Sequence, residues 1–592
     1  MLQSKENKTG NISLLTMQVL SVLPLLCFFF LYTQGIVYIA IALMLILLLS
    51  FNIYLVFRGK SIKRYPLVFL LMGSFYVFAF YGLGSIQTPQ TFHTLKNGQS
   101  VTLFDFEKPV AVDRTCYYVG IDKNVNFVLE AKTSNGWEKF YSYEKSYPYS
   151  FRWKCIKHNV QTQKILLHVT KNEMMLGEVR FLYRNKLVPF TTSKKYLNDE
   201  QKSTIDTSYY SGMFFDEIYF GRTAYEIMHD MPVYENTHPY LGKHLITLGI
   251  KLFGMTPFGW RFMNVLFAGV LIFMAYHFGR QLFKKELHGF IASFLMTYSF
   301  IHLAQARVGL IDTFGVLFVL ISYFYLYRFI VSQKLSRLIV SGVFFGLAVG
   351  VKWSALFSIF GFSLIALYLL FTKYPLGKQY RGIKLIIYGF LSYGVVAFFV
   401  YVLSFYDIYA HTGSLQSIVN YNTNMFNYHS TLQATHPYSS PWWAWVLDIK
   451  PMGYYKQVKD GLLSSINAFG NPAIFWTGIA ALLYVFYVAI VRKTLEATFI
   501  LLAFLGLYVP YVFVGRLMFI YHFYYAVPFL ILAIVYMFKD IMERFNSVAK
   551  FYGVYLLLVS GLFLSFYPVL SGYVISQLYV TEYLKWFSTW WF

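Results

Sequence analysis

Long uncharged apolar runs recur along the whole chain, and they constrain its fold more than any other feature of the sequence. About thirteen of these runs reach the ~20 residues that a helix needs to cross the hydrocarbon core of a bilayer. They centre near residues 25, 47, 76, 270, 297, 321, 345, 363, 395, 483, 506, 530 and 561. Because 57% of the residues are hydrophobic and only 13% are charged, we expect a polytopic α-helical protein of the lipid bilayer. The first run has no small-residue cleavage signal, which favours a retained anchor.

Basic residues gather in short connections between the apolar runs, and their positions predict the topology. The connections are residues 58–64, 279–288, 332–337, 373–384, 491–493 and 539–544. With the N-terminus inside, every one of them falls in the cytoplasm, as the positive-inside rule requires. The net charge of +23 is then explained by these loops and by attraction to anionic lipid or phosphate-bearing substrates, so nucleic acid is not an expected partner.

This topology divides the chain into six parts. They are three N-terminal spans (1–87), an extracellular β-sandwich domain (88–190), an extracellular loop with amphipathic helices (191–257), a transmembrane core (258–408), an extracellular loop (409–472), and C-terminal spans with an outer tail (473–592). Alternating segments such as "SVTLFDF" and "GEVRFLY" predict the small all-β sandwich. Cys116 and Cys155 fall in this domain and can pair if it is extracellular.

Ionisable and aromatic side chains gather at the predicted outer ends of the spans. The stretch "FFDEIYFGRTAYEIMHDMPVYENTHPYLGKHL" places Asp216 beside Glu217 at the start of a short helix, with His238 and Lys243 after it. Other members of the set are Arg307, Asp312, Lys352, Trp353, His436, Trp442, Trp443, Arg516 and His522. Charges at a membrane edge are costly unless they are paired, solvated or used. Because the cytoplasmic ends have no matching set, the outer face is the predicted functional site.

These residue types suit group transfer from a lipid phosphate. The Asp216 carboxylate can accept the proton of an incoming hydroxyl, and Arg307 and Lys352 can bind a departing phosphate. Trp442 and Trp443 suit the apolar face of a sugar or an isoprenoid tail. The structural alternatives are that Asp216 only caps a helix, that the two cations only extend to headgroups, and that the tryptophans form an interfacial belt.

Several segments resemble the bacterial members of the protein O-mannosyltransferase family. They are "FDEIYFGRTAYEI", "ARVGLIDTFGVLF", "GLAVGVKWSALF", "THPYSSPWWAW", "GNPAIFWTG" and "RLMFIYHFYYAVPF", which follow the family's order between residues 214 and 540. The resemblance implies the GT-C fold and a polyprenyl-phosphate sugar donor used at the outer face. It departs at Tyr240, which replaces the second proline of the family's "HPP", and the 409–470 loop is too short for the large sugar-binding insert of eukaryotic members.

The resemblance also implies roles for individual residues. It makes Asp216 the general base beside Glu217, places Arg307 on the lipid phosphate, and lets Asp312 hold the Arg307 region. The other candidates for donor binding are Lys352, Lys243, His238, Arg516 and His522. The supporting candidates are Asp312, Trp353, His436, Trp442 and Trp443. No cofactor is expected, and the need for a divalent metal stays open because no ligand set has convincing spacing.

The resulting hypothesis is a membrane glycosyltransferase that moves a sugar, mannose being favoured, to Ser or Thr hydroxyls of exported proteins by single-step inversion. The alternative acceptor for the same chemistry is a wall polymer or glycolipid. A transporter or flippase predicts charges at the bilayer midplane and inverted repeats, which the sequence lacks. A sugar-binding sensor would need far fewer spans than about thirteen for an anchor.

Overall fold

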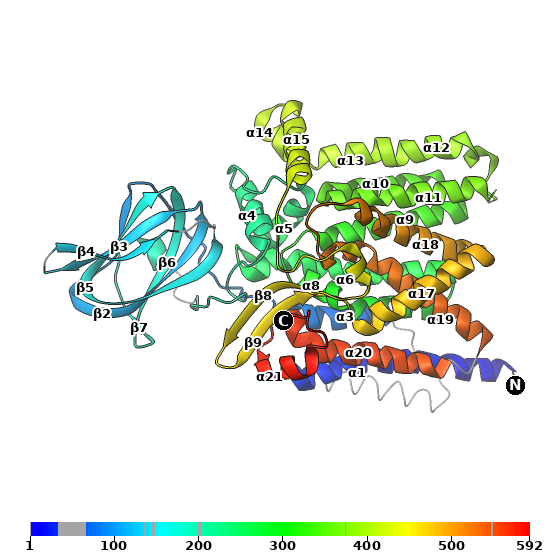
Figure 1. Ribbon diagram of the computed structural model, residues 1–592, viewed down its shortest axis with the longest axis horizontal. Helices are drawn as coiled ribbons and strands as arrows, with labels where there is room; N and C mark the ends of the chain where they lie inside the picture. The colour runs from blue at the N-terminus through cyan, green and yellow to red at the C-terminus, as the bar shows by residue number, and fades with distance from the viewer. Residues whose placement is uncertain are drawn as a thin grey trace. The chain divides into compact units, whose positions relative to one another are not determined.

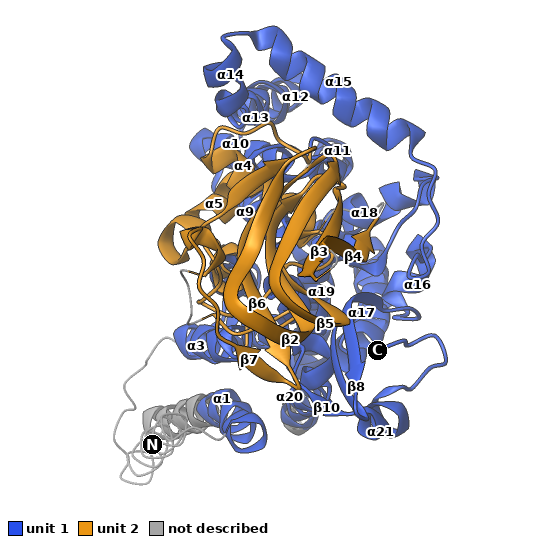
Figure 2. Cartoon of the chain, turned by 90° about the vertical axis from the view of Figure 1, so that its left-hand side faces the viewer, with its two compact units in different colours: residues 1–81, 236–242, 264–592 blue, residues 82–235, 243–263 orange. Residues whose placement is uncertain are grey.

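The computed structural model describes residues 2–33, 67–134, 136–144, 149–198, 203–372, 375–545 and 549–592. Its contacts divide the chain into two compact units, the first made of residues 1–81, 236–242 and 264–592 and the second of residues 82–235 and 243–263 (Figure 2). The apolar run near residue 47 and the basic connection at 58–64 lie outside the described residues.

Apolar helices make up most of the first unit (Figure 1). They are α1 (Leu2–Tyr32), α3 (Leu67–Phe80), α6 (Pro257–Phe283), α7 (Glu286–Thr297), α8 (Phe300–Ala306), α9 (Asp312–Ser332), α10 (Leu335–Val351), η2 (Trp353–Phe357), α11 (Ser358–Phe371), α12 (Ile383–Phe390), η4 (Leu391–Val396), α13 (Ala397–Leu403), α17 (Pro472–Val491), α18 (Leu495–Tyr508), η5 (Val509–Phe513), α19 (Val527–Arg544) and α20 (Ala549–Ser571). Every predicted centre among the described residues falls inside one of these helices.

The number of membrane spans is bounded by helix length and composition. In the described part of the chain, seven helices are long and apolar enough to cross a membrane, or eight if α7 and α8, bent by 61°, form one span. Shorter apolar helices cover residues 16–32, 67–80 and 335–351. A multi-pass membrane protein is therefore confirmed, while the total of about thirteen spans stays a prediction.

Small residues allow the helices of the first unit to approach one another closely. A Cβ added to Gly342 on α10 would clash with the backbone of Ser392 in η4, and one on Gly506 in α18 would clash with the backbone of Gly361 in α11. The backbones of these helix pairs therefore touch directly, a packing mode that suits helices without a hydrophobic force between them.

Short elements lie between the apolar helices of the first unit along the chain. They are α14 (Tyr406–Thr412), α15 (Leu415–Thr431), α16 (Trp442–Val446), β8 (Met452–Lys459), β9 (Leu462–Ala468), η6 (Ile520–Tyr525), β10 (Ile575–Ser576) and α21 (Gln577–Tyr579). Strands β8, β9 and β10 form a small antiparallel sheet in the order β10-β9-β8. Helix α15 is amphipathic, because Ile418, Tyr421 and Met425 make one buried side.

An antiparallel sheet dominates the second unit. Its strands are β1 (His93–Lys96), β2 (Ser100–Asp122), β3 (Asn126–Thr133), β4 (Gly136–Tyr143), β5 (Ser150–Lys171), β6 (Glu173–Tyr183) and β7 (Lys186–Val188). They form one seven-stranded sheet in the order β1-β6-β2-β5-β3-β4, with β7 beside β6. The all-β prediction is confirmed, but the strands make one continuous sheet in place of the two stacked sheets of a sandwich.

Two very long strands, β2 and β5, run through the whole sheet and allow it to curl around the apolar core. The pairing of β2 with β5 shifts register three times, between Thr102 and Arg114, and such bulges bend and twist a strand. The curled sheet encloses a single apolar core that includes Phe104, Phe127 and Phe181.

A disulfide links the two longest strands. Cys116 on β2 lies opposite Cys155 on β5, and the two sulfur atoms are bonded, while Cys27 in α1 is free. The predicted possibility of this pair is confirmed. Helices α4 (Glu217–Met228) and α5 (Leu241–Phe253) follow the sheet along the chain, where the sequence predicts short helices.

Candidate functional site

A pocket of about 220 Å³ with several charged side chains in its wall opens in the first unit, and we call it the polar pocket. Its walls come from the segment before α5, the junction of α10 with η2, helix α15 and the segment leading into η6. The lysine, arginine and histidine side chains that line it are Lys352, Arg516, His238, His429 and His522. The pocket thus brings together four predicted donor-binding residues, with Trp353 beside them, from positions up to 284 residues apart in the chain (522 minus 238).

An ion pair lies at the wall of this pocket. Lys352 directly follows α10, and its Nζ atom lies 2.8 Å from Oδ1 of Asp312, the first residue of α9. Both side chains are buried. The carboxylate also sits at a helix N-terminus, where the helix dipole favours negative charge. Asp312 therefore compensates Lys352 and fixes the position of its ammonium group.

His429 is a pocket residue that the sequence reasoning missed. Its Nε2 atom lies 2.7 Å from the carbonyl oxygen of Thr237, and its Nδ1 atom lies 2.9 Å from Nη1 of Arg516. Arginine only donates, so Nδ1 accepts and Nε2 carries the proton of a neutral imidazole. The signal was present in the sequence, because His429 continues the buried side of α15 at helical spacing from Met425.

The charge state of His429 follows from its surroundings. Burial, with the nearby His238 and Arg516 as further causes, lowers the pKa of His429 to about 4. The ring is therefore neutral at physiological pH, and it holds the Arg516 guanidinium without compensating its charge. Arg516 thus gives the pocket a positive charge that an anion can meet.

The remaining pocket histidines have different settings. His522 is buried, its ring stacks on Trp445 with centroids 5.9 Å apart, and burial lowers its pKa. The His238 ring lies 5.5 Å from the ring of His429. Tyr240 follows shortly after and packs against Tyr421 of α15 at 5.2 Å. At the position of the family's second proline, this chain therefore has Tyr240, whose ring contacts α15.

The predicted supporting residues divide into two groups. Trp353 lines the pocket, and its indole N–H donates to the Tyr401 hydroxyl at 2.9 Å. Trp442 packs against the Tyr508 ring at 5.7 Å, and Trp443 is half exposed. His436 packs against Phe519. In the part of the chain that the structure describes, the set lining the pocket excludes Trp442, Trp443 and His436.

Arg307 is buried at a helix junction. Its Nη1 atom donates to the carbonyl oxygens of Ala79 and Tyr81 at 2.7 Å each and of Phe78 at 3.3 Å, and its Nη2 atom donates to that of Ser571 at 2.8 Å. The guanidinium therefore binds the C-terminal ends of α3 and α20 to each other. These contacts favour a structural role over the phosphate contact expected from the sequence.

The second unit places the adjacent carboxylates Asp216 and Glu217 in contrasting surroundings. Glu217 is fully buried and pairs with Arg261, whose Nε and Nη2 atoms lie 2.6 and 2.8 Å from its two oxygens. Asp216 directly precedes α4, is half-buried, and makes no side-chain capping hydrogen bond to that helix. Glu217 is therefore held by Arg261 inside the unit, whereas Asp216 lies at the start of α4 and is partly accessible.

Lys243 is also held inside the second unit. It is fully buried, forms an ion pair with the Glu235 carboxylate, and donates to the Glu235 carbonyl oxygen at 2.8 Å. The sequence analysis predicts that Lys243 binds the donor, but the structure pairs its ammonium group with Glu235. Among the described residues, no group of three or more His, Cys, Asp and Glu side chains could hold a metal ion.

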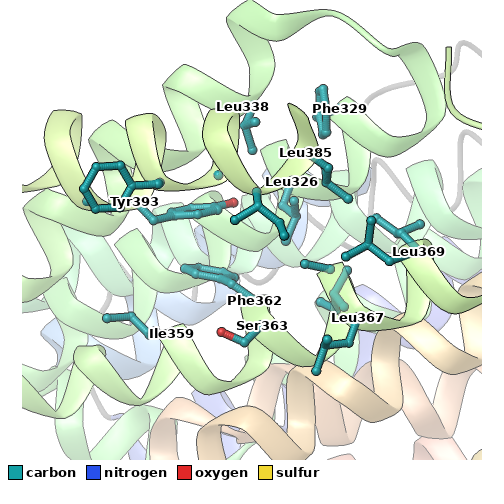
Figure 3. A pocket seen from close by; sticks show the side chains of 17 residues that line it. Leu326, Phe329, Leu338, Ile359, Phe362, Ser363, Leu367, Leu369, Leu385 and Tyr393 are labelled. Atoms are coloured by element: carbon teal, nitrogen blue, oxygen red, sulfur yellow. The ribbon is translucent and has the colours of Figure 1, made fainter. Parts of the chain in front are cut away.

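A second pocket, of about 520 Å³, is apolar (Figure 3). Leu326 and Phe329 of α9, Leu338 of α10 and Phe362 of α11 are among its lining residues, with Tyr393 of η4. The α9 residues lie near the end of the helix that begins at Asp312. The apolar pocket is therefore at the opposite end of α9 from the ion pair, and its lining contains no ionisable acid or base of the predicted set.

Two family models match most of the first unit. The model described as "Dolichyl-phosphate-mannose-protein mannosyltransferase" matches residues 237–428, and the one described as "C-terminal four TMM region of protein-O-mannosyltransferase" matches residues 414–590. Together these segments contain every residue that lines the polar pocket. Neither covers the seven-stranded sheet.

Curated relatives and a solved structure extend this likeness. A "Polyprenol-phosphate-mannose--protein mannosyltransferase" of Corynebacterium glutamicum is 26% identical over 426 residues, 60% of this chain and 81% of the relative. The protein of the same name from Mycolicibacterium smegmatis is 25% identical over 437 residues, 61% of this chain and 85% of the relative. The structure of the S. cerevisiae protein O-mannosyltransferase Pmt1-Pmt2 complex bound to the sugar donor has a TM-score of 0.56 at 12% identity, covering 64% of this chain and 89% of that chain.

Proposed function

Because this chain belongs to the protein O-mannosyltransferase family, with the GT-C fold, we propose that it transfers mannose from a polyprenyl-phosphate carrier to Ser or Thr hydroxyls of exported proteins. The observation that carries the proposal is the cationic pocket, whose lining residues all fall within the two family matches. The names of the relatives support both the lipid-linked donor and the protein acceptor.

The charges of the pocket suit the phosphate of such a donor. Asp312 compensates Lys352 and His429 is neutral, so Arg516 supplies positive charge to a phosphodiester, which carries a single negative charge. The leaving phosphate gains a second negative charge as the glycosyl bond breaks. Lys352 and Arg516 then stabilise that charge more strongly than they bind the ground state, which accelerates the reaction.

The transfer step balances without a cofactor. The acceptor oxygen forms a bond to C1 of the mannose from the face opposite the phosphate, and the bond from C1 to the phosphate oxygen breaks, leaving its electron pair on that oxygen. The proton of the acceptor hydroxyl passes to the Asp216 carboxylate. One displacement of this kind inverts the anomeric carbon.

The function is tested with purified protein and labelled polyprenyl-phosphate-mannose. We expect label to pass to a peptide rich in Ser and Thr, and β-elimination to release it as O-linked mannose. A parallel reaction with a wall polymer or a glycolipid distinguishes the alternative acceptor. Transfer to the polymer or glycolipid without transfer to the peptide would overturn the protein acceptor while keeping the donor chemistry.

Replacing Arg516 is expected to weaken donor binding. In Arg516→Ala the phosphate loses a charge-assisted hydrogen bond of ~1.5–3 kcal/mol, so the affinity for a non-hydrolysable mannosyl lipid phosphonate should fall by about 10- to 100-fold. The matched control is Lys585→Ala, which removes an exposed cation outside the pocket and should leave the affinity unchanged. Equal affinity of the Arg516→Ala variant and the unmodified protein would contradict phosphate binding in this pocket.

The outer face is part of the proposal, and it rests on the basic connections and on the disulfide, which forms in oxidising compartments. A Cys27→Ser background keeps the disulfide and leaves no other cysteine in the chain. In intact cells, an impermeant maleimide should label Ser439→Cys and should label Ser336→Cys only after the membrane is opened. Labelling of Ser336→Cys in intact cells would place this connection outside the cell and contradict the predicted topology.

A further inference from the structure

We propose that strand β5 of the sheet positions Asp216 by bracing the loop of residues 207–216 that leads into α4. The inference rests on the proposed role of Asp216 as the base, and it gives the sheet domain, which lies outside both family matches, a part in the reaction. Every residue involved belongs to the second unit.

The first residues of β5 contact this loop through backbone and side chain. Met213 N donates to the carbonyl oxygen of Phe151 at 3.2 Å, and Arg152 Nη2 donates to that of Thr207 at 3.2 Å. The Phe151 ring, fully buried, lies 4.9 Å from the ring of Tyr225 on α4. The strand therefore touches both the loop and the helix between which Asp216 sits.

A glycine allows the strand and the loop to come this close. A Cβ added to Gly212 would lie 2.5 Å from Cβ of Arg152 and 3.2 Å from its Cα. Any larger residue would push the loop away from β5. On its other side, the Gly212 carbonyl oxygen accepts from Arg261 Nη2 at 3.1 Å, so the loop is held between β5 and the buried Glu217–Arg261 pair.

The backbone at the contact adopts a costly conformation. Phe215, directly before Asp216, has a φ of +48°, and Phe151 on β5 has a φ of +46°. Bulky residues rarely adopt left-handed φ values, and they keep them only where the surrounding structure enforces them. The backbone of Phe215, which orients Asp216, is thus expected to relax if the contact with β5 is removed.

Phe151 is in turn anchored to the body of the sheet. Its ring lies 5.7 Å from Phe92 in an edge-to-face arrangement. Phe92 packs directly over the sheet, because a Cβ on Gly120 or Gly177 would lie 2.8 or 3.1 Å from its ring. A continuous series of contacts therefore runs from β2 and β6 through Phe92 and Phe151 to the loop before Asp216.

The test measures mannosyl transfer by Phe151→Ala and Gly212→Ala in the full-length protein. We expect kcat to fall by about 10- to 100-fold, because misplacing a reacting group by 1 Å has this effect, while donor affinity and acceptor KM stay near those of the unmodified protein. The matched controls are Trp137→Ala, half exposed on β4, and Gly73→Ala, where nothing lies within 4 Å of the added Cβ. Both should keep full turnover, and all variants should keep the Cys116–Cys155 bond.

A double variant separates positioning from loss of stability. If Phe151 acts through Asp216, adding Phe151→Ala to Asp216→Asn should cause no further fall in the residual turnover. An equal loss in both backgrounds, or a change confined to acceptor KM, would overturn the proposal in favour of general destabilisation or acceptor binding. If Phe151→Ala keeps full turnover while Asp216→Asn is inactive, the proposal that β5 positions Asp216 is overturned and the base assignment stands. If Asp216→Asn keeps full turnover, both the base assignment and the proposal that rests on it are overturned.

Discussion

Asp216→Asn is expected to lower mannosyl transfer by two or more orders of magnitude, about the size of effect that loss of a general base produces. Asparagine keeps the shape of the side chain but cannot accept the proton of the acceptor hydroxyl. Turnover should therefore fall while donor affinity stays close to that of the unmodified protein. The measurement is the initial rate of labelled mannose transfer to a peptide, together with binding of a non-hydrolysable donor analogue.

The neighbouring carboxylates provide the controls for this experiment. Asp230→Asn changes an exposed carboxylate after the same helix, at a φ of +53° that asparagine tolerates, so it should keep normal turnover. Glu217→Gln tests a different property, because it removes the charge that Arg261 pairs with inside the unit and should lower thermal stability. Near-normal turnover of purified Asp216→Asn would refute the assignment of the base.

The contrast between Asp216 and Glu217 shows where sequence reasoning reaches its limit. The adjacent pair attracts attention because two carboxylates in an apolar chain are costly. Only the fold reveals that Glu217 meets Arg261, 44 residues later, and that this pair also binds the Gly212 carbonyl oxygen. Glu217 thus anchors the loop through Arg261, and the role of general base that we propose belongs to Asp216 alone.

Helices could be located from the sequence because each apolar run carries its own evidence of crossing a bilayer. Strand pairing could not, because alternation tells which side of a strand is apolar and leaves open which strand lies beside it. The sequence of residues 88–190 therefore predicts the strands and the possible Cys116–Cys155 pair, while the single curled sheet depends on bulges in β2 and β5 that have no pattern in the sequence.

The polar pocket could be predicted only in part for a similar reason. Lys352, Arg516, His238 and His522 were found because each lies in a segment with ionisable groups near a predicted span end. The Asp312–Lys352 pair joins two helices at positions 40 residues apart, which no local spacing rule reaches. His429 lies on an amphipathic helix in a polar loop, where a histidine is common. Its contacts with Thr237 and Arg516 join segments far apart in the sequence, so only the fold identifies it as a pocket residue.

Arg307→Ala should cause the largest loss of stability among these variants. The guanidinium donates to the carbonyl oxygens that end α3 and α20. The Phe78 carbonyl also accepts from the Tyr567 hydroxyl, and each of the other buried carbonyls left without a donor costs ~1–3 kcal/mol. We expect a markedly lower thermal denaturation midpoint in detergent, and a smaller loss for Arg307→Lys, whose ammonium group reaches fewer of the carbonyls.

The same variant decides between the two roles of Arg307. If the residue is structural, the fraction of Arg307→Ala that remains folded should bind the mannosyl lipid phosphonate with the affinity of the unmodified protein. Arg280→Ala is the matched control, because its side chain is half exposed and its ion pair with Glu286 lies at the surface, where such pairs contribute ~0–1 kcal/mol. An unchanged denaturation midpoint with a strongly reduced donor affinity would instead place Arg307 on the lipid phosphate, as the family resemblance implies, and would require its four carbonyl contacts to be exchanged when the donor binds.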